Sequence, residues 1–156
     1  MAAAEETSIT VRSATPADRA VVPSFISAET ARGRGSLVLL RTGQGLLWVA
    51  VGGAESADNK LVGLLLATVQ IDVEREEAVG YIHELLVHPA YRRLGVANHL
   101  LDVAERFFLE EQGLARIELA TSPDNEAALH LYRSRGYTLS QVRLAKLRSA
   151  APPLDA

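Results

Sequence analysis

The sequence predicts a mixed α/β domain, with a sheet flanked by helices. Strand-like and helix-like segments alternate in the order strand, helix, strands, helix, strand, helix, strand. A chain of 156 residues with 48% hydrophobic side chains can bury one sizeable core. No internal repeat is present. We therefore expect a single domain over residues 9–149, between a flexible N-terminus (1–8) and a loose C-terminal tail (150–156).

Composition argues against several classes of function. Sixteen basic and nineteen acidic residues give a net charge of -3, whereas nucleic-acid-binding domains are strongly basic. The absence of cysteine excludes disulfides, thiolate zinc sites and cysteine nucleophiles. The longest apolar run, Leu61–Val69, is far shorter than the roughly 18 residues of a membrane span, and no signal-peptide pattern precedes it. We expect a soluble, cytoplasmic protein that binds neither nucleic acid nor membranes.

The N-terminal part predicts a strand followed by one or two helices. Ile9–Arg12 alternates as a strand does, and Thr15 and Asp18 are turn and cap residues. An apolar pattern with helical spacing follows over residues 20–26. The basic, glycine-rich stretch 32–36 matches no phosphate-binding pattern, so we expect a solvated loop there.

The next segments predict three strands. Leu46–Val51 and Leu61–Ile71 are apolar runs separated by glycines and polar residues, as in a hairpin, and Trp48 is expected in the core. Residues 72–77 are acidic; we expect a charged turn, with attraction of a cationic substrate as the alternative. Tyr81–Val87 then forms another strand.

A glycine turn joins this strand to a helix. The strand breaks at His88–Pro89, and Arg92, Arg93 and Gly95 precede a helix that begins at Val96. Such a turn directs free backbone N–H groups and the positive end of a helix dipole at one point. The pattern therefore predicts a phosphate site. Apolar residues at helical spacing continue to Phe108, and a left-handed cap at Gly113 ends the helix.

The last part predicts a strand, a helix and a final strand. Ile117–Thr121 is strand-like, and Ser122–Pro123 offers an N-cap with proline at the first helical position. A helix is expected over residues 125–135, ending at Gly136, and the final strand over Tyr137–Leu147.

Two motifs resemble those of a known family. Arg92–Ala97 (RRLGVA) resembles the Arg/Gln-x-x-Gly-x-Gly/Ala acyl-CoA signature of the GNAT superfamily of N-acyltransferases. Asn125–Tyr132, followed by Gly136 and Tyr137, is similar to that family's Asn-x-x-Ala-x-x-x-Tyr helix. The opening residues 9–18 also match, so the resemblance covers most of the chain. It implies a mostly antiparallel, mixed sheet in which a splayed strand pair holds acyl-CoA.

The resemblance implies acetyl-CoA as cosubstrate and no metal. The N–H groups of Arg93–Ala97 would cradle the pyrophosphate, with either Arg133 or Arg135 near the 3′-phosphate. The pantetheine arm would follow the strand that ends at Leu86–Val87, and Asn125 would hold its amides. The cofactor-binding residues so implied are Leu86, Val87, Arg92, Arg93, Leu94, Gly95, Val96, Ala97, Asn125 and Tyr132.

The implied chemistry is direct attack of an amine on the thioester in a ternary complex. An amine with a pKa of about 10.4 is neutral in only about one molecule in a thousand at pH 7, so a base is useful. Glu84, His83 and Tyr81 are the candidates. A regular strand would place Glu84 on the face opposite to the other two, whereas a bulge, which the family resemblance makes possible here, would change that assignment. His83 has the best intrinsic pKa. The resemblance assigns Tyr132 to protonate the leaving thiolate.

The C-terminal end of the sequence departs from the family pattern in the region that forms the acceptor pocket. The family usually ends with two strands that wall this pocket, but here only residues 137–149 remain before the tail. The wall is then missing, very short, or lent by a second subunit of a homodimer. The acceptor amine is a small molecule, a protein N-terminus or a lysine. A non-catalytic acyl-CoA-binding regulatory module is the alternative function, and a domain that binds another phosphate compound is a third.

Overall fold

The computed structural model describes residues 8–29, 34–53 and 60–146. Nearly all of the N-terminus predicted to be flexible, and the whole predicted tail, lie outside these residues. The chain divides into two compact units, Met1–Ala120 and Thr121–Ala156, and each is described by itself. No helix in the described part is long and apolar enough to cross a membrane.

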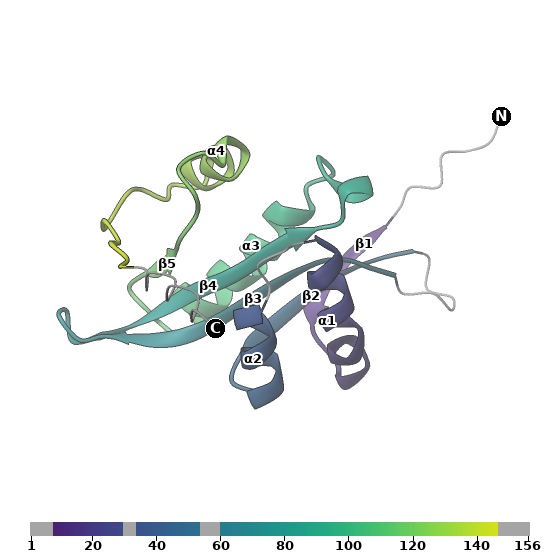
Figure 1. Cartoon of the computed structure of the whole chain (residues 1–156), viewed down its shortest axis with the longest axis horizontal. Helices are drawn as coiled ribbons and strands as arrows, with labels where there is room; N and C mark the ends of the chain where they lie inside the picture. Colours follow the sequence, from purple (N-terminus) through teal and green to yellow (C-terminus); the bar gives the residue numbers. More distant parts are fainter. Residues whose placement is uncertain (1–7, 30–33, 54–59, 147–156) are drawn as a thin grey trace, which may run out of the picture. The chain divides into compact units, whose positions relative to one another are not determined.

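The first unit contains a five-stranded sheet with its strands in chain order (Figure 1). The first four strands pair antiparallel, and the fifth pairs parallel with the fourth. The mixed, mostly antiparallel sheet is thus confirmed. The strands are β1 (Ile9–Ser13), β2 (Leu46–Gly52), β3 (Lys60–Asp72), β4 (Glu77–Val87) and β5 (Ile117–Leu119).

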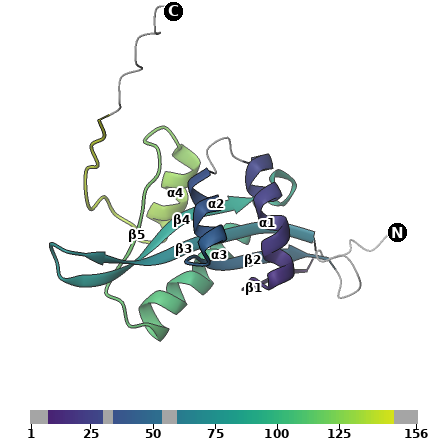
Figure 2. The ribbon, with the colours of Figure 1, turned by 60° about the horizontal axis from the view of Figure 1, so that its bottom comes forward.

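Helices cover both faces of this sheet (Figure 2). Helices α1 (Pro16–Glu29) and α2 (Arg34–Thr42) lie on one face, and α3 (Val96–Glu105), continued by a π-helical turn (Arg106–Glu111), lies on the other. The core under α1 joins Val22 and Ile26 to apolar side chains of β2 and β3. Burial of these faces is the main favourable contribution to the stability of such a layered fold.

Helix α2 corrects the loop expected at 32–36. Residues 34–36 are helical, and residues 32 and 33 lie outside the described residues. Leu39 and Leu40 of α2 pack against the core beneath α1. Tertiary packing of such an apolar face stabilises a helix that Gly35 would otherwise weaken.

The start of α1 is fixed by reciprocal hydrogen bonds. The Thr15 N–H donates to the Asp18 carboxylate at 2.7 Å, and the Asp18 N–H donates to Thr15 Oγ1 at 3.3 Å. This is a capping box, as the turn and cap residues predicted. Arg12 of β1 also donates to Asp18, at 2.5 and 3.2 Å. These hydrogen bonds, chiefly that from Arg12, lower the pKa of Asp18 to about 2.

Three aromatic rings pack together between the sheet and the π-helical turn. Trp48, which is 6% exposed, meets Phe107 and Phe108 edge-on at centroid distances of 5.4 and 6.0 Å. Phe108 also covers Gly80 of β4, where an added Cβ would lie 2.7 Å from the ring. Trp48 is therefore a core residue, as predicted, and Gly80 permits the close approach of the helix.

Within residues 121–146, the described part of the second unit, there is one helix, α4 (Glu126–Ser134). Its N-cap is Asn125, whose Oδ1 accepts the N–H of Ala128 at 3.2 Å, so the N-cap predicted at Ser122 is wrong. A left-handed residue, Gly136 (φ +89°), follows the helix as predicted.

The strand predicted over Tyr137–Leu147 is also wrong. Residues 137–146 form neither strand nor helix, and Leu147 lies outside the described residues. Leu139, Val142 and Leu144 are 79–90% exposed. The physical reason is that a strand needs a paired neighbour, and the apolar side chains here change parity between Leu139 and Val142, so they line no single face.

Candidate active site

A β-bulge at His83 brings the three candidate bases together. In the pairing of β3 with β4, Glu84 lies opposite Leu66 and Ile82 opposite Ala67, so His83 is the extra residue. Tyr81 lies opposite Thr68, which shares a face of β3 with Leu66. Glu84 and Tyr81 therefore share a face, so the bulged alternative holds and not the opposite faces of a regular strand.

This shared face is the one covered by α1 and α2, because Leu66 belongs to the core beneath α1. The His83 ring joins it, packing against the Tyr81 ring at a centroid distance of 4.8 Å. The bulge thus gathers Tyr81, His83 and Glu84 into one cluster, the β4 cluster.

The environment of His83 keeps its ring neutral near pH 7. Burial lowers the pKa of His83 from its ordinary value of 6.5, and the charge of Glu84 offsets this only in part. His83 Nε2 also lies 2.7 Å from the Thr68 hydroxyl of β3. Thr68 was missed by sequence reasoning, because nothing local links two residues on different strands.

Strands β4 and β5 separate beyond the bulge. Their pairing runs from Gly80–Ile117 to Ile82–Leu119, where β5 ends while β4 continues to Val87. In the described part of the chain, no strand lies beside residues 83–87 on the β5 side. The splayed pair expected from the resemblance is therefore present.

The direction of the backbone groups on this open edge follows from one hydrogen bond. The His88 N–H donates to Val62 O of β3 at 2.7 Å. Because N–H groups alternate sides along a strand, that of Leu86 also points to β3, whereas those of Leu85 and Val87 point to the open edge. Sequence reasoning named Val87 but missed Leu85, and it could not tell which side Leu86 faces without the strand register.

The predicted phosphate turn connects this edge to α3. Arg93 and Gly95 both adopt left-handed backbone conformations, with φ of +64° and +78°. Gly95 is the N-cap of α3, and no atom lies within 4 Å of where its Cβ would be. Arg92 donates from Nε to Val87 O at 3.3 Å. The first N–H groups of α3 have no carbonyl partner within the helix, and they follow directly on this open position at Gly95.

The six predicted turn residues have different side-chain environments. Arg92, Arg93, Leu94 and Gly95 are exposed, whereas Val96 is buried and Ala97 is half-buried. Val96 packs over Gly63 of β3, with its Cγ1 3.1 Å from where a Cβ would stand. Only the main chain of Val96 can therefore face a ligand.

The remaining predicted site residues belong to the second unit. Tyr132 lies on α4 and meets the Tyr137 ring edge-on at 5.6 Å. Asn125 caps the same helix. The structure thus groups the β4 cluster, the open edge and the turn in one unit, and Asn125 with Tyr132 in the other.

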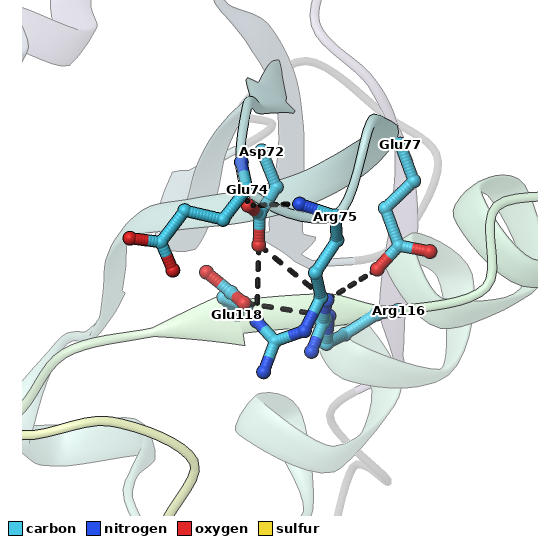
Figure 3. A network of polar contacts seen from close by, with 6 residues as sticks. All are labelled: Asp72, Glu74, Arg75, Glu77, Arg116 and Glu118. Carbon is cyan, nitrogen blue, oxygen red and sulfur yellow. Dashed lines mark hydrogen bonds and ion pairs between the residues drawn. The ribbon is translucent and has the colours of Figure 1, made fainter.

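A polar network links the β3–β4 turn to the start of β5 (Figure 3). Arg116 forms an ion pair with Glu77 and lies 3.5 Å from Asp72 and 3.4 Å from Glu118. Asp72 also accepts from the Arg75 side chain at 3.0 Å. Since arginines of the chain itself neutralise these carboxylates, residues 72–77 are the charged turn that was predicted. The network holds β5 against β4 at the end opposite to the splay.

Comparison with known proteins identifies the family. The model of the acetyltransferase (GNAT) family matches residues 19–137. N-alpha-acetyltransferase daf-31 of Caenorhabditis elegans is 37% identical over 81 residues, which cover 52% of this chain and 44% of that protein. The N-terminal acetyltransferase A complex catalytic subunit ard1 of Schizosaccharomyces pombe is 31% identical over 80 residues, 51% of this chain and 45% of that protein. The chain spans about half the length of the curated relatives it matches.

A solved structure shares the fold. The aminoglycoside N-acetyltransferase AAC(6')-Iy, in complex with the bisubstrate analogue CoA-S-monomethyl-acetylneamine, aligns with a TM-score of 0.70 at 16% identity. The alignment covers 93% of this chain and 100% of that one. Because the family model spans most of the sequence, including the phosphate turn and α4, the chain belongs to the acetyltransferase (GNAT) family.

Proposed function

We propose that the chain transfers an acetyl group from acetyl-CoA to a primary amine by direct attack of the amine on the thioester in a ternary complex. One observation carries this proposal: the open edge of β4 is followed, after one 3-10 turn over Pro89–Tyr91, by the left-handed turn that begins α3. A strand edge suits an extended arm with amide groups, and a helix N-terminus suits its phosphates.

The cosubstrate would be held mainly by the main chain. The N–H groups of Arg93–Ala97 hold the pyrophosphate, and the space at Gly95 lets it approach closely. Leu85 offers its N–H and C=O groups to the pantetheine arm, and Val87 offers its N–H, since its carbonyl already accepts from Arg92. One of these N–H groups also holds the thioester oxygen as negative charge develops, a contribution of about 3 kcal/mol.

Three proton transfers accompany the reaction. The β4 cluster takes a proton from the acceptor ammonium, and His83, neutral near pH 7, is ready to do so. The amine nitrogen then bonds to the carbonyl carbon, and the C–S bond breaks. Tyr132 gives its phenolic proton to the leaving thiolate. The new amide nitrogen loses its second proton to solvent, and the phenol of Tyr132 is restored from solvent. Asn125, already the cap of α4, holds the pantetheine amides with its remaining amide hydrogens.

The favoured acceptor is the free N-terminus of a protein. The two curated relatives at 37% and 31% identity are named as N-terminal or N-alpha-acetyltransferases. The aminoglycoside enzyme matches at only 16%, a level that supports the fold alone. Lysines and small amines are the other candidates, and a cytoplasmic location, like homodimer formation, remains a prediction of the sequence.

The alternative is a regulatory module that binds acyl-CoA without catalysis. The observation that favours it is the lack of a strand over residues 137–146 that could wall an acceptor pocket. A second subunit could supply this wall, which would retain the transferase function.

Release of free CoA tests the proposal. The protein has no cysteine, so a thiol reagent in the assay reports CoA alone. We expect release with peptides that have a free N-terminus, and none with matched peptides whose N-terminus is blocked and which contain no lysine. Lysine peptides, polyamines and aminoglycosides complete the panel. Tight CoA binding without release, at concentrations where the protein is monomeric and where it is dimeric, would refute the transferase and favour the module.

A further inference from the structure

We propose that Thr68 is a positioning residue for His83, holding its ring in the tautomer whose Nδ1 accepts the proton of the acceptor ammonium. The inference rests on the proposed function and deepens it, because it selects His83 from the β4 cluster as the proton acceptor. It assigns a role to a residue of β3, outside the motifs that carry the family resemblance.

The bulge creates the contact. Thr68 pairs with Tyr81 in the strand register, and a regular β4 would give His83 its own partner on β3. As the extra residue, His83 instead reaches across the strand pair to the Thr68 hydroxyl, at 2.7 Å from Nε2. The Tyr81 ring packs against the imidazole at 4.8 Å and 55°. One hydrogen bond at the ring edge and one aromatic contact together limit how the imidazole can turn.

The hydrogen bond decides which nitrogen is basic. In neutral imidazole one nitrogen is a donor and the other an acceptor. If Nε2–H donates to Thr68 Oγ1, the lone pair is on Nδ1 and the ring can act as a base there. If Thr68 donates instead, Nδ1 carries the proton and cannot accept another.

The first arrangement is favoured because neutral histidine free in water prefers its proton on Nε2. It is also compatible with the Gln70 side-chain nitrogen, which lies 3.5 Å from the same Thr68 oxygen and donates to it. The Thr68 oxygen has two lone pairs and can accept from both neighbours.

The local charges suit this transfer. Glu84 is the charged group that acts on His83, the Tyr81 ring packs against it, and its hydrogen-bond partner on β3, Thr68, is uncharged. The ammonium gives one proton to Nδ1, which leaves a neutral amine and an imidazolium beside the Glu84 carboxylate. No bond to carbon changes in this step. The imidazolium returns to neutral by releasing its proton to solvent after the amide has formed.

The variant Thr68→Val tests the inference, because it removes the hydroxyl and keeps the β-branched shape. We expect turnover to fall about tenfold, the size of one lost neutral hydrogen bond, with the KM for acetyl-CoA unchanged. Thr68→Ser retains the hydroxyl and should stay within about twofold of wild type. Thr10→Val, the same change at an exposed position of β1, is the matched control and should have no effect.

A spectroscopic measurement separates positioning from packing. The ¹⁵N shifts of labelled histidine, with the His83 signals assigned through His83→Gln, report the tautomer directly. We expect the proton on Nε2 in wild type and Thr68→Ser, and a mixture of tautomers in Thr68→Val. Should Thr68→Val not fold, Thr68→Ala makes the same comparison.

Three results would overturn the inference: an unchanged His83 tautomer in Thr68→Val, equal losses of turnover in the Val and Ser variants, or full turnover in His83→Gln. If wild type transfers no acetyl group to any amine, the proposed function fails and the catalytic role assigned to Thr68 fails with it. The tautomer comparison still decides, in that case, whether Thr68 sets the state of the His83 ring.

Discussion

Substituting Gly95 by alanine should weaken acetyl-CoA binding far more than it destabilises the fold. Gly95 has φ of +78°, and no atom lies within 4 Å of the position of the new Cβ. The folded protein therefore meets only the left-handed backbone cost, about 1–2 kcal/mol. At about 3 °C per kcal/mol, this lowers Tm by about 3–6 °C.

The binding loss has a different origin. If the pyrophosphate occupies the space at Gly95, the new methyl group displaces it from at least one backbone N–H. A hydrogen bond to a charged group contributes about 1.5–3 kcal/mol, so Kd should rise about 10- to 150-fold. Calorimetric titration with CoA measures the rise in Kd, and thermal unfolding measures the fall in Tm.

A matched control exists in Gly113, which also has positive φ (+65°) and no atom within 4 Å of its Cβ position. Gly113→Ala should lower Tm by a similar amount and leave the Kd for CoA unchanged. Equal affinities for CoA in the two variants, both close to wild type, would refute the assignment of the turn as the phosphate site.

Three other substitutions test separate parts of the structure. Tyr132→Phe should lower kcat about 100-fold while the Kd for CoA is unchanged, and full activity would remove its role as the acid. Gly80→Ala places a Cβ 2.7 Å from the Phe108 ring and should cost about 1–3 kcal/mol in urea denaturation; an unchanged midpoint would show that the helix can move away. The pKa of Asp18 is about 2 in the folded protein, below its ordinary 3.8, so its contacts stabilise the fold above about pH 4 and lose this effect as pH falls through 2. The difference in unfolding free energy between wild type and Asp18→Asn should therefore shrink between pH 4 and pH 2, and a difference independent of pH would contradict the pairing with Arg12.

The left-handed turn before α3 could be predicted because its determinants are local. A glycine between a strand and a helix marks the place where the backbone must turn left-handed, and Gly95 does so. The strands with long apolar runs could also be predicted from local signals. So could the capping box of Thr15 and Asp18.

The bulge and its consequences depend on pairing between strands. His83 and Thr68 are fifteen residues apart, and their contact exists only because β4 has one more residue than β3 at this point. No periodicity in β4 alone reveals this. The sequence therefore left open whether Glu84 and Tyr81 lie on opposite faces of a regular strand or are rearranged by a bulge.

The other errors arise where local signals compete or need a distant partner. Ser122 and Asn125 are both residue types that favour the N-cap position, and α4 begins after Asn125. Leu39 and Leu40 make α2 a helix through contacts with residues far along the chain. The apolar residues of 137–146 satisfy the composition of a strand without its pairing.

The aromatic packing at the π-helical turn also makes folding visible by optical means. Trp48 is the single tryptophan of the chain, and its indole contacts both phenylalanines of the turn that follows α3. Its emission therefore reports whether this helix rests on the sheet, since separation would expose the indole to water and shift the emission to longer wavelength. The unfolding of the wild-type protein can therefore be followed with no added probe.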